Sequence, residues 1–452
     1  WPGGFIKKTA PTVVGPVDGE GGSASGIWTL DQAADYEQRG LWPMPTLGRE
    51  LYAWGRNTYG SLGLGNTTNL SSPVQVGTQT TWSEPASGLY FSLSTKTDGT
   101  LWSWGDNSYG NLGLGNTTAY SSPVQIGIYT TWSKVTAGED FTTAVKTDGT
   151  LWAWGSNSQG QLGNGATSPN RSSPVQIGAL TNWLDTSSGS SYTLATKTDG
   201  TLWAWGTNAY GQLGQGNTTA NSSPVQVGAL TTWSKIAAQF YTSFATKTDG
   251  TLWAWGTNNQ GQLGDGTTTA RSSPVQIGAL TTWANIANGT FHSIATQTNG
   301  TLWTWGYNEK GPLGQGNTTN YSSPVQVGAL TTWLNVAGGM YSTYAIKTDG
   351  TLWVWGLGTS GQLGNSAAVD YSSPVQVGGL TTWSKVAGAR YTGLATTTAG
   401  TLYAWGSNAY GQLAQGTSGT ANSSPVQIGA LTTWNVISKN IQSQSILVTT
   451  KG

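Results

Sequence analysis

The sequence predicts an all-β protein, a closed β-propeller of eight four-stranded blades behind a short N-terminal extension. Three observations support this fold class. A Leu-(Trp/Tyr)-x-Trp-Gly motif recurs every 50 or 51 residues, and two other motifs recur with the same period. Each repeat also divides into short segments rich in β-branched and aromatic residues, separated by turn signals and without helical periodicity.

The three markers occur eight times each in residues 51–452. The first marker begins at Leu51, Leu101, Leu151, Leu202, Leu252, Leu302, Leu352 and Leu402. The second, Ser-Ser-Pro-Val-Gln-(Val/Ile)-Gly, has its proline at Pro73, Pro123, Pro174, Pro224, Pro274, Pro324, Pro374 and Pro425. The third is a tryptophan at Trp82, Trp132, Trp183, Trp233, Trp283, Trp333, Trp383 and Trp434. Eight copies predict eight blades in one domain, residues 51–452; the alternative is a seven-bladed ring with an eighth unit outside it.

One repeat illustrates the expected strands. Residues 233–237, 241–247, 252–255 and 274–277 are predicted to be strands, the last with Pro274 at its start or on a sheet edge. Asp249-Gly250 is a hairpin signal between the second and third strands. The glycine-rich segment 256–264 predicts turns with positive φ rather than a phosphate-binding loop, because no helix follows it.

Recurring tryptophans are expected to form the core between blades. Repeats contain 22 of the 25 tryptophans, and a large residue found in every repeat is better explained by packing than by ligand stacking. The ends of the chain predict how the ring closes. Residues 51–54 lack a preceding hairpin strand, and residues 445–450 resemble the missing strand, so we expect these two segments to pair.

Composition excludes several classes of function. Lys+Arg and Asp+Glu are 19 each, without the basic excess of a nucleic-acid binder. No cysteine and a single histidine argue against a metal site, and we expect no cofactor. No apolar run is long enough for membrane insertion. His292 is expected to be a buried strand residue; the alternative is a proton donor, for which no catalytic partner is evident.

The repeat Thr-Asp-Gly-Thr-Leu-Trp-Ala-Trp-Gly-x-Asn-x-x-Gly-Gln-Leu-Gly resembles that of the regulator of chromosome condensation family. The resemblance covers about nine-tenths of the chain. It implies a β-propeller that works by binding proteins, since members include a guanine-nucleotide exchange factor and a β-lactamase inhibitor. Members usually have seven blades, so eight repeats depart from the family pattern.

Residues 1–50 are predicted to be a separate extension. They contain 10 of the 38 charged residues, and residues 30–39 are expected to form one small helix after a capping box at Thr29 and Gln32. Residues 26–43 resemble a short segment of tailed-phage virion proteins. This resemblance implies an attachment segment that contacts other virion proteins, with Trp28, Leu30, Tyr36 and Trp42 as its candidate residues. A plug packed against the propeller is the alternative.

One short loop differs between otherwise similar repeats. Its last two residues are Leu89-Tyr90, Glu139-Asp140, Ser190-Ser191, Phe240-Tyr241, Thr290-Phe291, Met340-Tyr341, Arg390-Tyr391 and Ile441-Gln442. Repetition places these loops on one face of the ring, free of the packing that keeps the rest uniform. Drift at an unconstrained turn explains part of the variation. Phe240, Met340 and Arg390, however, are of types enriched at protein interfaces, which predicts a partner-binding face.

Three classes of function follow from these observations. The first is a non-enzymatic virion surface protein of a tailed phage, a tail or fibre component located on the particle, whose propeller binds a host receptor or another virion protein and which could form oligomers. The second is a bacterial propeller, secreted or intracellular, that acts as a protein-binding module. An enzyme is the third and weakest, because the acids are mostly repeated turn residues such as Asp148 and Asp249.

Overall fold

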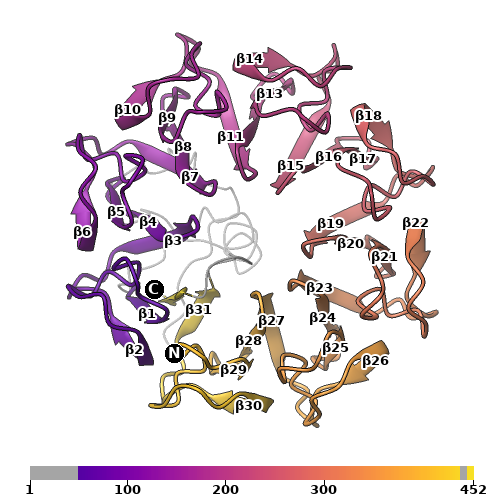
Figure 1. The fold of residues 1–452 in the computed structure, drawn as a ribbon. Coiled ribbons are helices and arrows are strands. Elements are labelled where there is room, and N and C mark those ends of the chain that lie inside the picture. Colours follow the sequence, from indigo (N-terminus) through magenta and orange to yellow (C-terminus); the bar gives the residue numbers. More distant parts are fainter. Residues whose placement is uncertain (1–48, 438–444, 452) are drawn as a thin grey trace, which may run out of the picture.

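The computed structural model describes residues 49–437 and 445–451, which form a ring of eight blades (Figure 1). In this part of the chain each blade is an antiparallel sheet of four strands. The predicted all-β, eight-bladed propeller is therefore confirmed, and the seven-bladed alternative is wrong. Residues 1–48 of the predicted extension, which include its predicted helix at residues 30–39, lie outside the described residues.

The four strands of each blade are called first to fourth from the centre of the ring outward, whatever their β label (Figure 1). The first strands are β3 (Trp82–Ser87), β7 (Trp132–Ala137), β11 (Trp183–Ser188), β15 (Trp233–Gln239), β19 (Trp283–Asn288), β23 (Trp333–Gly338), β27 (Trp383–Gly388) and β31 (Trp434–Ile437). The second strands are β4 (Phe91–Lys96), β8 (Phe141–Lys146), β12 (Tyr192–Lys197), β16 (Thr242–Lys247), β20 (His292–Gln297), β24 (Ser342–Lys347), β28 (Thr392–Thr397) and β32 (Ser445–Thr450).

The third and fourth strands complete the blades. The third strands are β5 (Leu101–Gly105), β9 (Leu151–Gly155), β13 (Leu202–Gly206), β17 (Leu252–Gly256), β21 (Leu302–Gly306), β25 (Leu352–Gly356), β29 (Leu402–Gly406) and β1 (Leu51–Gly55). The fourth strands are β6 (Tyr120–Gln125), β10 (Arg171–Gln176), β14 (Asn221–Gln226), β18 (Arg271–Gln276), β22 (Tyr321–Gln326), β26 (Tyr371–Gln376), β30 (Asn422–Gln427) and β2 (Leu70–Gln75).

The fourth strand begins earlier than the sequence predicted. In the blade β15–β18, β18 begins at Arg271, so Pro274 lies inside the strand rather than at its start. The strand tolerates the proline because it pairs with β17 alone and because its register shifts between Arg271 and Val275. An edge strand with an irregular ladder does not need the amide hydrogen that proline lacks.

One blade contains both ends of the described ring and is called the closure blade. Its strand order is β2-β1-β32-β31, and β1 pairs with β32 from Leu51↔Thr449 to Gly55↔Ser445. The predicted pairing of residues 445–450 with residues 51–54 is confirmed. The last strands of the chain thus occupy the place that the first repeat leaves open, so the closure blade also has four strands.

The core lies at the junctions between neighbouring blades. Each buried cluster combines residues of two blades; one, for example, contains Phe91 and Leu112 of β3–β6 with Trp132 and Trp154 of β7–β10. The third-strand tryptophans are fully buried, as predicted. Each of these tryptophans also makes a perpendicular or tilted contact with the tryptophan that begins the first strand of its own blade, such as Trp132 with Trp154 at 5.8 Å.

A hydrogen bond crosses every junction. The indole Nε1–H of the third-strand tryptophan donates to a main-chain carbonyl in the loop between the third and fourth strands of the preceding blade, at 2.7–3.0 Å. The pairs are Trp54 with Gln412, Trp104 with Ser61, Trp154 with Asn111, Trp205 with Gln161, Trp255 with Gln212, Trp305 with Gln262, Trp355 with Pro312 and Trp405 with Gln362. We call these the junction bonds.

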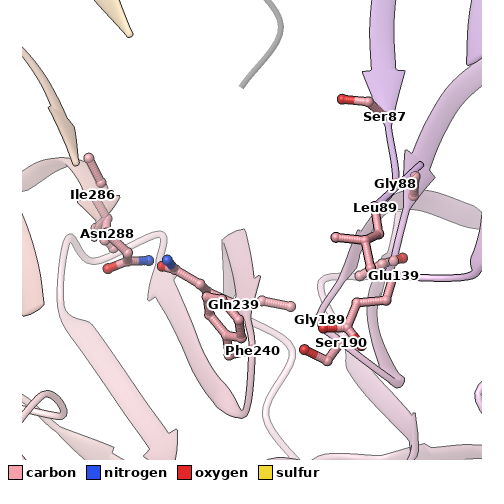
Figure 2. A pocket seen from close by; sticks show the side chains of 15 residues that line it. Ser87, Gly88, Leu89, Glu139, Gly189, Ser190, Gln239, Phe240, Ile286 and Asn288 are labelled. Carbon is pink, nitrogen blue, oxygen red and sulfur yellow. The ribbon is translucent and has the colours of Figure 1, made fainter. Parts of the chain in front are cut away.

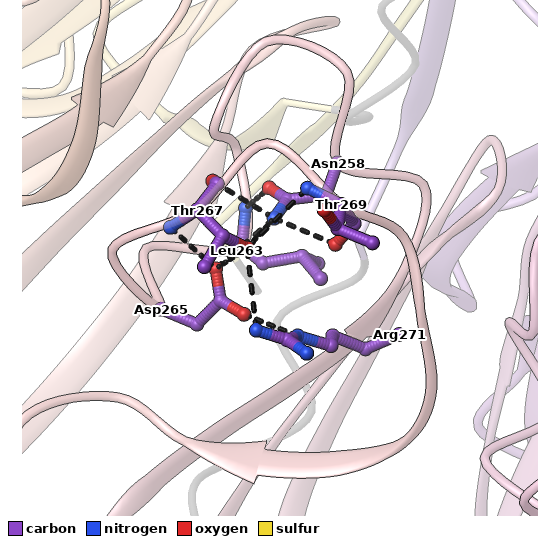
Figure 3. A network of polar contacts seen from close by, with 6 residues as sticks. All are labelled: Asn258, Leu263, Asp265, Thr267, Thr269 and Arg271. Carbon is purple, nitrogen blue, oxygen red and sulfur yellow. Dashed lines mark hydrogen bonds and ion pairs between the residues drawn. The ribbon is translucent and has the colours of Figure 1, made fainter.

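A buried asparagine shapes the loop that supplies the accepting carbonyl. Figure 3 shows Asn258, which donates through Nδ2 to the carbonyls of Thr267 and Thr269 and accepts from the amide of Leu263. Leu263 follows Gln262, whose carbonyl receives the Trp305 indole. The asparagine therefore holds the loop in the shape that presents this carbonyl. An ion pair between Arg271 and Asp265 closes the outer side of the same loop.

Glycine is needed where this loop meets the tryptophan. Gly264 has φ +83°, and an added Cβ would lie 2.7 Å from Nε1 of Trp305. The same contact recurs at the other junctions, apart from the closure junction, where Ala414 holds the equivalent place at φ 56°. The recurrent glycines of this loop were predicted to be positive-φ turns, and the structure adds the close approach to the indole as a second reason.

Most accepting carbonyls receive a second donor. The second residue of the second strand, a serine or threonine, donates its hydroxyl to the same oxygen at six junctions; at one of them Ser92 bonds the Ser61 carbonyl at 2.9 Å. At the closure junction Ile446 stands at this position, and Trp54 is the one described donor to the Gln412 carbonyl. The closure junction is therefore the most dependent on its tryptophan.

We expect Trp54→Phe to destabilise the ring more than Trp104→Phe. Each change removes one buried indole and its bond, but only Trp54→Phe leaves the carbonyl without a protein donor in the described residues. A buried carbonyl that loses its partner costs about 1–3 kcal/mol, which is the expected difference between the two variants. Urea unfolding followed by circular dichroism measures it.

Trp102→Phe is the control for this comparison. Trp102 is half-buried and donates within its own blade to the Thr100 hydroxyl, so its loss should cost least of the three. Equal midpoints for Trp54→Phe and Trp102→Phe would contradict the role given to the junction bonds.

Candidate functional site

The loops between first and second strands lie at one end of the blades, and together with the loops between third and fourth strands they form what we call the variable face. In an antiparallel blade these two connections leave from the same side. Figure 2 shows part of this face, where Leu89, Glu139, Ser190 and Phe240 border a hollow together with the ends of the first strands. The prediction that these loops share one face is thus confirmed for the described loops.

Neighbouring loops are joined through the main chain. The Leu89 amide donates to the Glu139 carbonyl at 3.0 Å, and the Glu139 and Ser190 amides donate in the same way to the carbonyls of Ser190 and Phe240. The Thr290 amide likewise faces the Met340 carbonyl at 3.4 Å. The residues joined in this way are the first residues of the variable pairs. Because main-chain atoms make these contacts, the side chains at these positions can differ without breaking them.

The predicted site residues are less exposed than the sequence suggested. Only Tyr241, at 38%, and Arg390 are exposed, and the others are half-buried: Leu89, Tyr90, Glu139, Asp140, Phe291, Phe240 and Met340. The expectation that this loop escapes packing is therefore wrong in part, because each loop leans on the next blade. The eighth pair, Ile441-Gln442, lies outside the described residues, as do Trp28, Leu30, Tyr36 and Trp42.

Glycine at the start of the loop depends on the residue three positions later, a relation that sequence reasoning missed. A Cβ on Gly88 would lie 2.0 Å from the Phe91 ring, and Gly138, Gly189 and Gly289 meet the rings of Phe141, Tyr192 and His292 in the same way. Where the second strand begins with threonine instead, at Thr242 and Thr392, the loop carries Gln239 and Ala389. The signal in the sequence was a glycine three residues before an aromatic residue or histidine, although Gly339 precedes the small Ser342.

The loop that carries Gln239 adopts a different turn. Strand β15 continues to Gln239, which pairs with Thr242, so Phe240 and Tyr241 form a two-residue turn. Phe240 has φ 42°, in the left-handed region that residues other than glycine seldom adopt. This turn places one large aromatic side chain at the edge of the hollow, opposite Glu139 and Ser190 (Figure 2).

Aromatic pairs cross the junctions on this face, a second feature that sequence reasoning missed. Tyr90 lies 5.0 Å from Tyr59, between ring centroids, and Tyr241 lies 5.3 Å from Tyr210. In both pairs the second ring comes from the loop between third and fourth strands of the preceding blade. Phe291 and Tyr341 stack at 5.9 Å, and Tyr307 lies 5.3 Å from Tyr341. A tyrosine before the loop glycine, as at Tyr59 and Tyr210, was the available signal.

One sector of the face is acidic. Burial raises the pKa of the Asp140 carboxyl to about 6, and the negative charges of Glu139 and Asp106 add to the shift. Asp106 itself accepts from the Ser108 hydroxyl at 2.7 Å. Among the described residues no group of three or more histidines and carboxylates has a metal-binding arrangement.

His292 is a buried strand residue, as predicted. It is 1% exposed at the start of β20, and its Nε2 lies 2.9 Å from the Thr343 hydroxyl of the next blade. Burial lowers its pKa to about 3, so the ring is neutral near neutral pH. Its contact supports blade packing. No helix in the described part of the chain is long and apolar enough to cross a membrane.

The fold and this face define a class of protein: a closed β-propeller with a repeated frame and one variable face. The chain belongs to the regulator of chromosome condensation family. The model of the RCC1-like domain matches residues 123–368 and 184–452, and the model of the regulator of chromosome condensation (RCC1) repeat matches residues 50–94 and 98–145. The predicted family resemblance is confirmed. Neither model covers residues 1–49. A comparison with curated protein sequences finds no significant match.

Solved structures show the same fold at low sequence identity. Human WBSCR16 is 20% identical, with a TM-score of 0.62, and the match covers 77% of this chain and 100% of that one. Prp20p from Saccharomyces cerevisiae is 18% identical, with a TM-score of 0.63, over 90% of this chain and 92% of that one. Yeast RCC1 (Prp20) in a structure with bound Kap60 is 17% identical, with a TM-score of 0.62, over 89% of each chain.

We expect Asp140→Asn to stabilise the protein at pH 7.5 but not at pH 4. The folded-state pKa of about 6 lies above the ordinary aspartate pKa of 3.8, so the folded state binds more protons between these pH values. Stability of the unmodified protein therefore falls as the pH rises from about 4 to about 6. Asparagine removes this loss. Because solvent screens part of the effect, the expected gain in Tm is about 1–3 °C.

Asp148→Asn is the matched control for Asp140→Asn. Hydrogen bonds from the Thr150 hydroxyl and amide lower the pKa of the Asp148 carboxyl, so its stabilising contribution is present at pH 7.5 and is lost in acid. This variant should show no gain at pH 7.5. A Tm for Asp140→Asn that stays at or below that of the unmodified protein at pH 7.5 would contradict the raised pKa.

Proposed function

We propose that this protein is a non-enzymatic protein-binding module and that the variable face is its binding surface. One observation carries the proposal: the variation between repeats falls on loops that touch their neighbours through main-chain atoms. The first residues of the variable pairs can therefore differ between repeats without breaking these main-chain bonds. Tyrosine, phenylalanine, methionine and arginine on this face are the types that protein interfaces favour.

Family membership supports a binding role. Among the solved structures of the same fold, Prp20p is described with binding properties to Gsp1p and histones, and yeast RCC1 with bound Kap60. Identities of 17–18% to these proteins carry the fold over to this chain, not the partners. The kind of partner that this protein binds is therefore inferred from the chemistry of its variable face.

The arrangement of acids supports a role without catalysis. Asp148, Asp199 and Asp249 each accept from a threonine two residues later, at the hairpin between second and third strands. These carboxylates lie one per blade at the end opposite the variable face, and each shapes its own turn. General acid–base chemistry needs such groups to converge on one substrate.

The narrower prediction places the protein on the surface of a tailed-phage virion, attached through residues 1–50 and binding a host receptor. It rests on the resemblance of residues 26–43, together with the absence of cysteine and the low charge of the chain. Those residues lie outside both the family matches and the described structure, so the binding role is proposed independently of this location. Deleting residues 1–45 tests the attachment: the propeller should stay folded and lose assembly into particles.

Photo-crosslinking tests the binding surface. A photoreactive phenylalanine analogue at position 240, 290 or 340 should capture the same protein in an extract of the cells that make this protein. Matched control sites are Leu230, Leu280 and Leu330, which are 45%, 39% and 47% exposed at the opposite end of the same blades. We expect at least tenfold more product from the variable face than from the control sites. Equal capture from both ends would contradict the proposal.

A further inference from the structure

Two arginines share a small hollow above the closure blade, on the variable face. Arg56 comes from the loop after β1, and Arg390 comes from the loop between β27 and β28. Tyr59, Leu89 and Tyr90 line the same hollow. The residues thus come from the closure blade and from the blades on both sides of it.

Arg56 is held in place by its neighbours. Its guanidinium carbon lies 5.3 Å from the centroid of the Tyr90 ring and 5.2 Å from that of the Tyr410 ring, which belong to the blades on either side. Its Nε donates to the Thr58 hydroxyl at 3.1 Å. These contacts involve two aromatic rings and one of the guanidinium donors. The two terminal NH2 groups keep the paired geometry that suits an oxyanion.

Neither arginine has a carboxylate partner among the described residues. The described ion pairs of the chain, Arg271 with Asp265 and Lys310 with Asp370, lie elsewhere. Arg390 is exposed, and its guanidinium carbon lies 5.5 Å from the centroid of the Tyr391 ring. Only 8% of the residues of this protein are charged, so two arginines in one hollow without a counter-ion point to a negatively charged ligand.

The surrounding charges limit what that ligand is. The acidic sector with Asp106 and Asp140 lies in the two blades that follow the closure blade, and the Leu89 amide of the hollow donates to the Glu139 carbonyl. A long polyanion laid over this face would meet repulsion from the acidic sector. A protein surface that carries both signs of charge can match both sectors.

We propose that Arg56 and Arg390 form a carboxylate-binding pocket that receives an aspartate or glutamate side chain of the protein partner. This inference rests on the proposed function and names the chemistry of its partner. The tyrosines supply the apolar walls and Arg56 the fixed fork of donors. Arg390, being exposed, adds charge from the other side.

Two blocked heptapeptides provide the probe, one with a glutamate between two lysines and one with glutamine in its place. Binding to the full chain is followed by fluorescence anisotropy at constant ionic strength. We expect the glutamate peptide to bind at least tenfold more tightly than the glutamine peptide. Arg56→Gln with Arg390→Gln should abolish this difference, whereas Arg56→Lys should keep part of it, because lysine retains the charge but not the fork.

Arg171→Gln is the control for each single arginine change, since it removes one positive charge from β10, a fourth strand outside the hollow. It should leave the preference for glutamate unchanged. Equal binding of the two peptides would overturn the proposal, as would a preference that survives in the double variant. Tighter binding of a heparin oligosaccharide than of the glutamate peptide would overturn it in favour of a polyanion. If neither peptide binds but crosslinking at positions 240, 290 and 340 succeeds, the result supports the proposed binding face and contradicts the carboxylate-binding pocket.

Discussion

The junction bond between a third-strand tryptophan and a loop carbonyl of the preceding blade is the interaction on which the rest of this structure depends. It recurs at all eight junctions of the described ring, with a spread of only 2.7–3.0 Å. Because the junction bond has nearly the same length at every junction, it fixes the spacing between neighbouring blades. A ring can close only when that spacing is nearly the same at every junction. The buried asparagines and positive-φ glycines of the loop serve this bond, because they shape the loop that presents the carbonyl.

Burial and hydrogen bonding contribute in different ways. A tryptophan buries roughly 150–250 Å², which at about 25 cal/mol per Å² corresponds to an upper limit of roughly 4–6 kcal/mol. A hydrogen bond contributes about 1 kcal/mol net. Apolar burial therefore supplies most of the cohesion between blades, while the hydrogen bond, being directional, sets their relative position. On the variable face, main-chain hydrogen bonds join several neighbouring loops, so the first residues of the variable pairs can differ without breaking these bonds.

Repetition made most of the fold predictable from the sequence. Eight copies of each marker gave the number of blades, and the incomplete first repeat gave the pairing of β1 with β32. The edge position of Pro274 was predicted correctly, but the start of its strand was predicted three residues too late, because a ladder that shifts register leaves no trace in local patterns. Contacts between blades were also missed. Tyr59 lies in the loop between β1 and β2, and Tyr90 lies in the loop between β3 and β4 of the next blade. Neither position alone shows that the two rings meet.

The candidate site was predictable only in outline. Comparing repeats located the variable loops, but the half-buried state of Leu89 and Met340 depends on how closely the next blade approaches. The hollow with both arginines was not predicted, since Arg56 and Arg390 stand far apart in the sequence and line one hollow only because the ring closes. The same closure that completes the fold thus creates the most distinctive chemistry on the variable face.

Hydrogen exchange at the indole N–H groups, measured by nitrogen-15 NMR, tests the central role of the junction bonds most directly. The indoles of Trp54, Trp104 and the six equivalent tryptophans should exchange only through opening of the ring, at rates close to those of the slowest main-chain amides. The half-buried Trp102, whose indole bonds a hydroxyl within its own blade, should exchange much faster. Exchange of the junction indoles at the rate of Trp102 would show that these bonds open locally and do not hold the ring together.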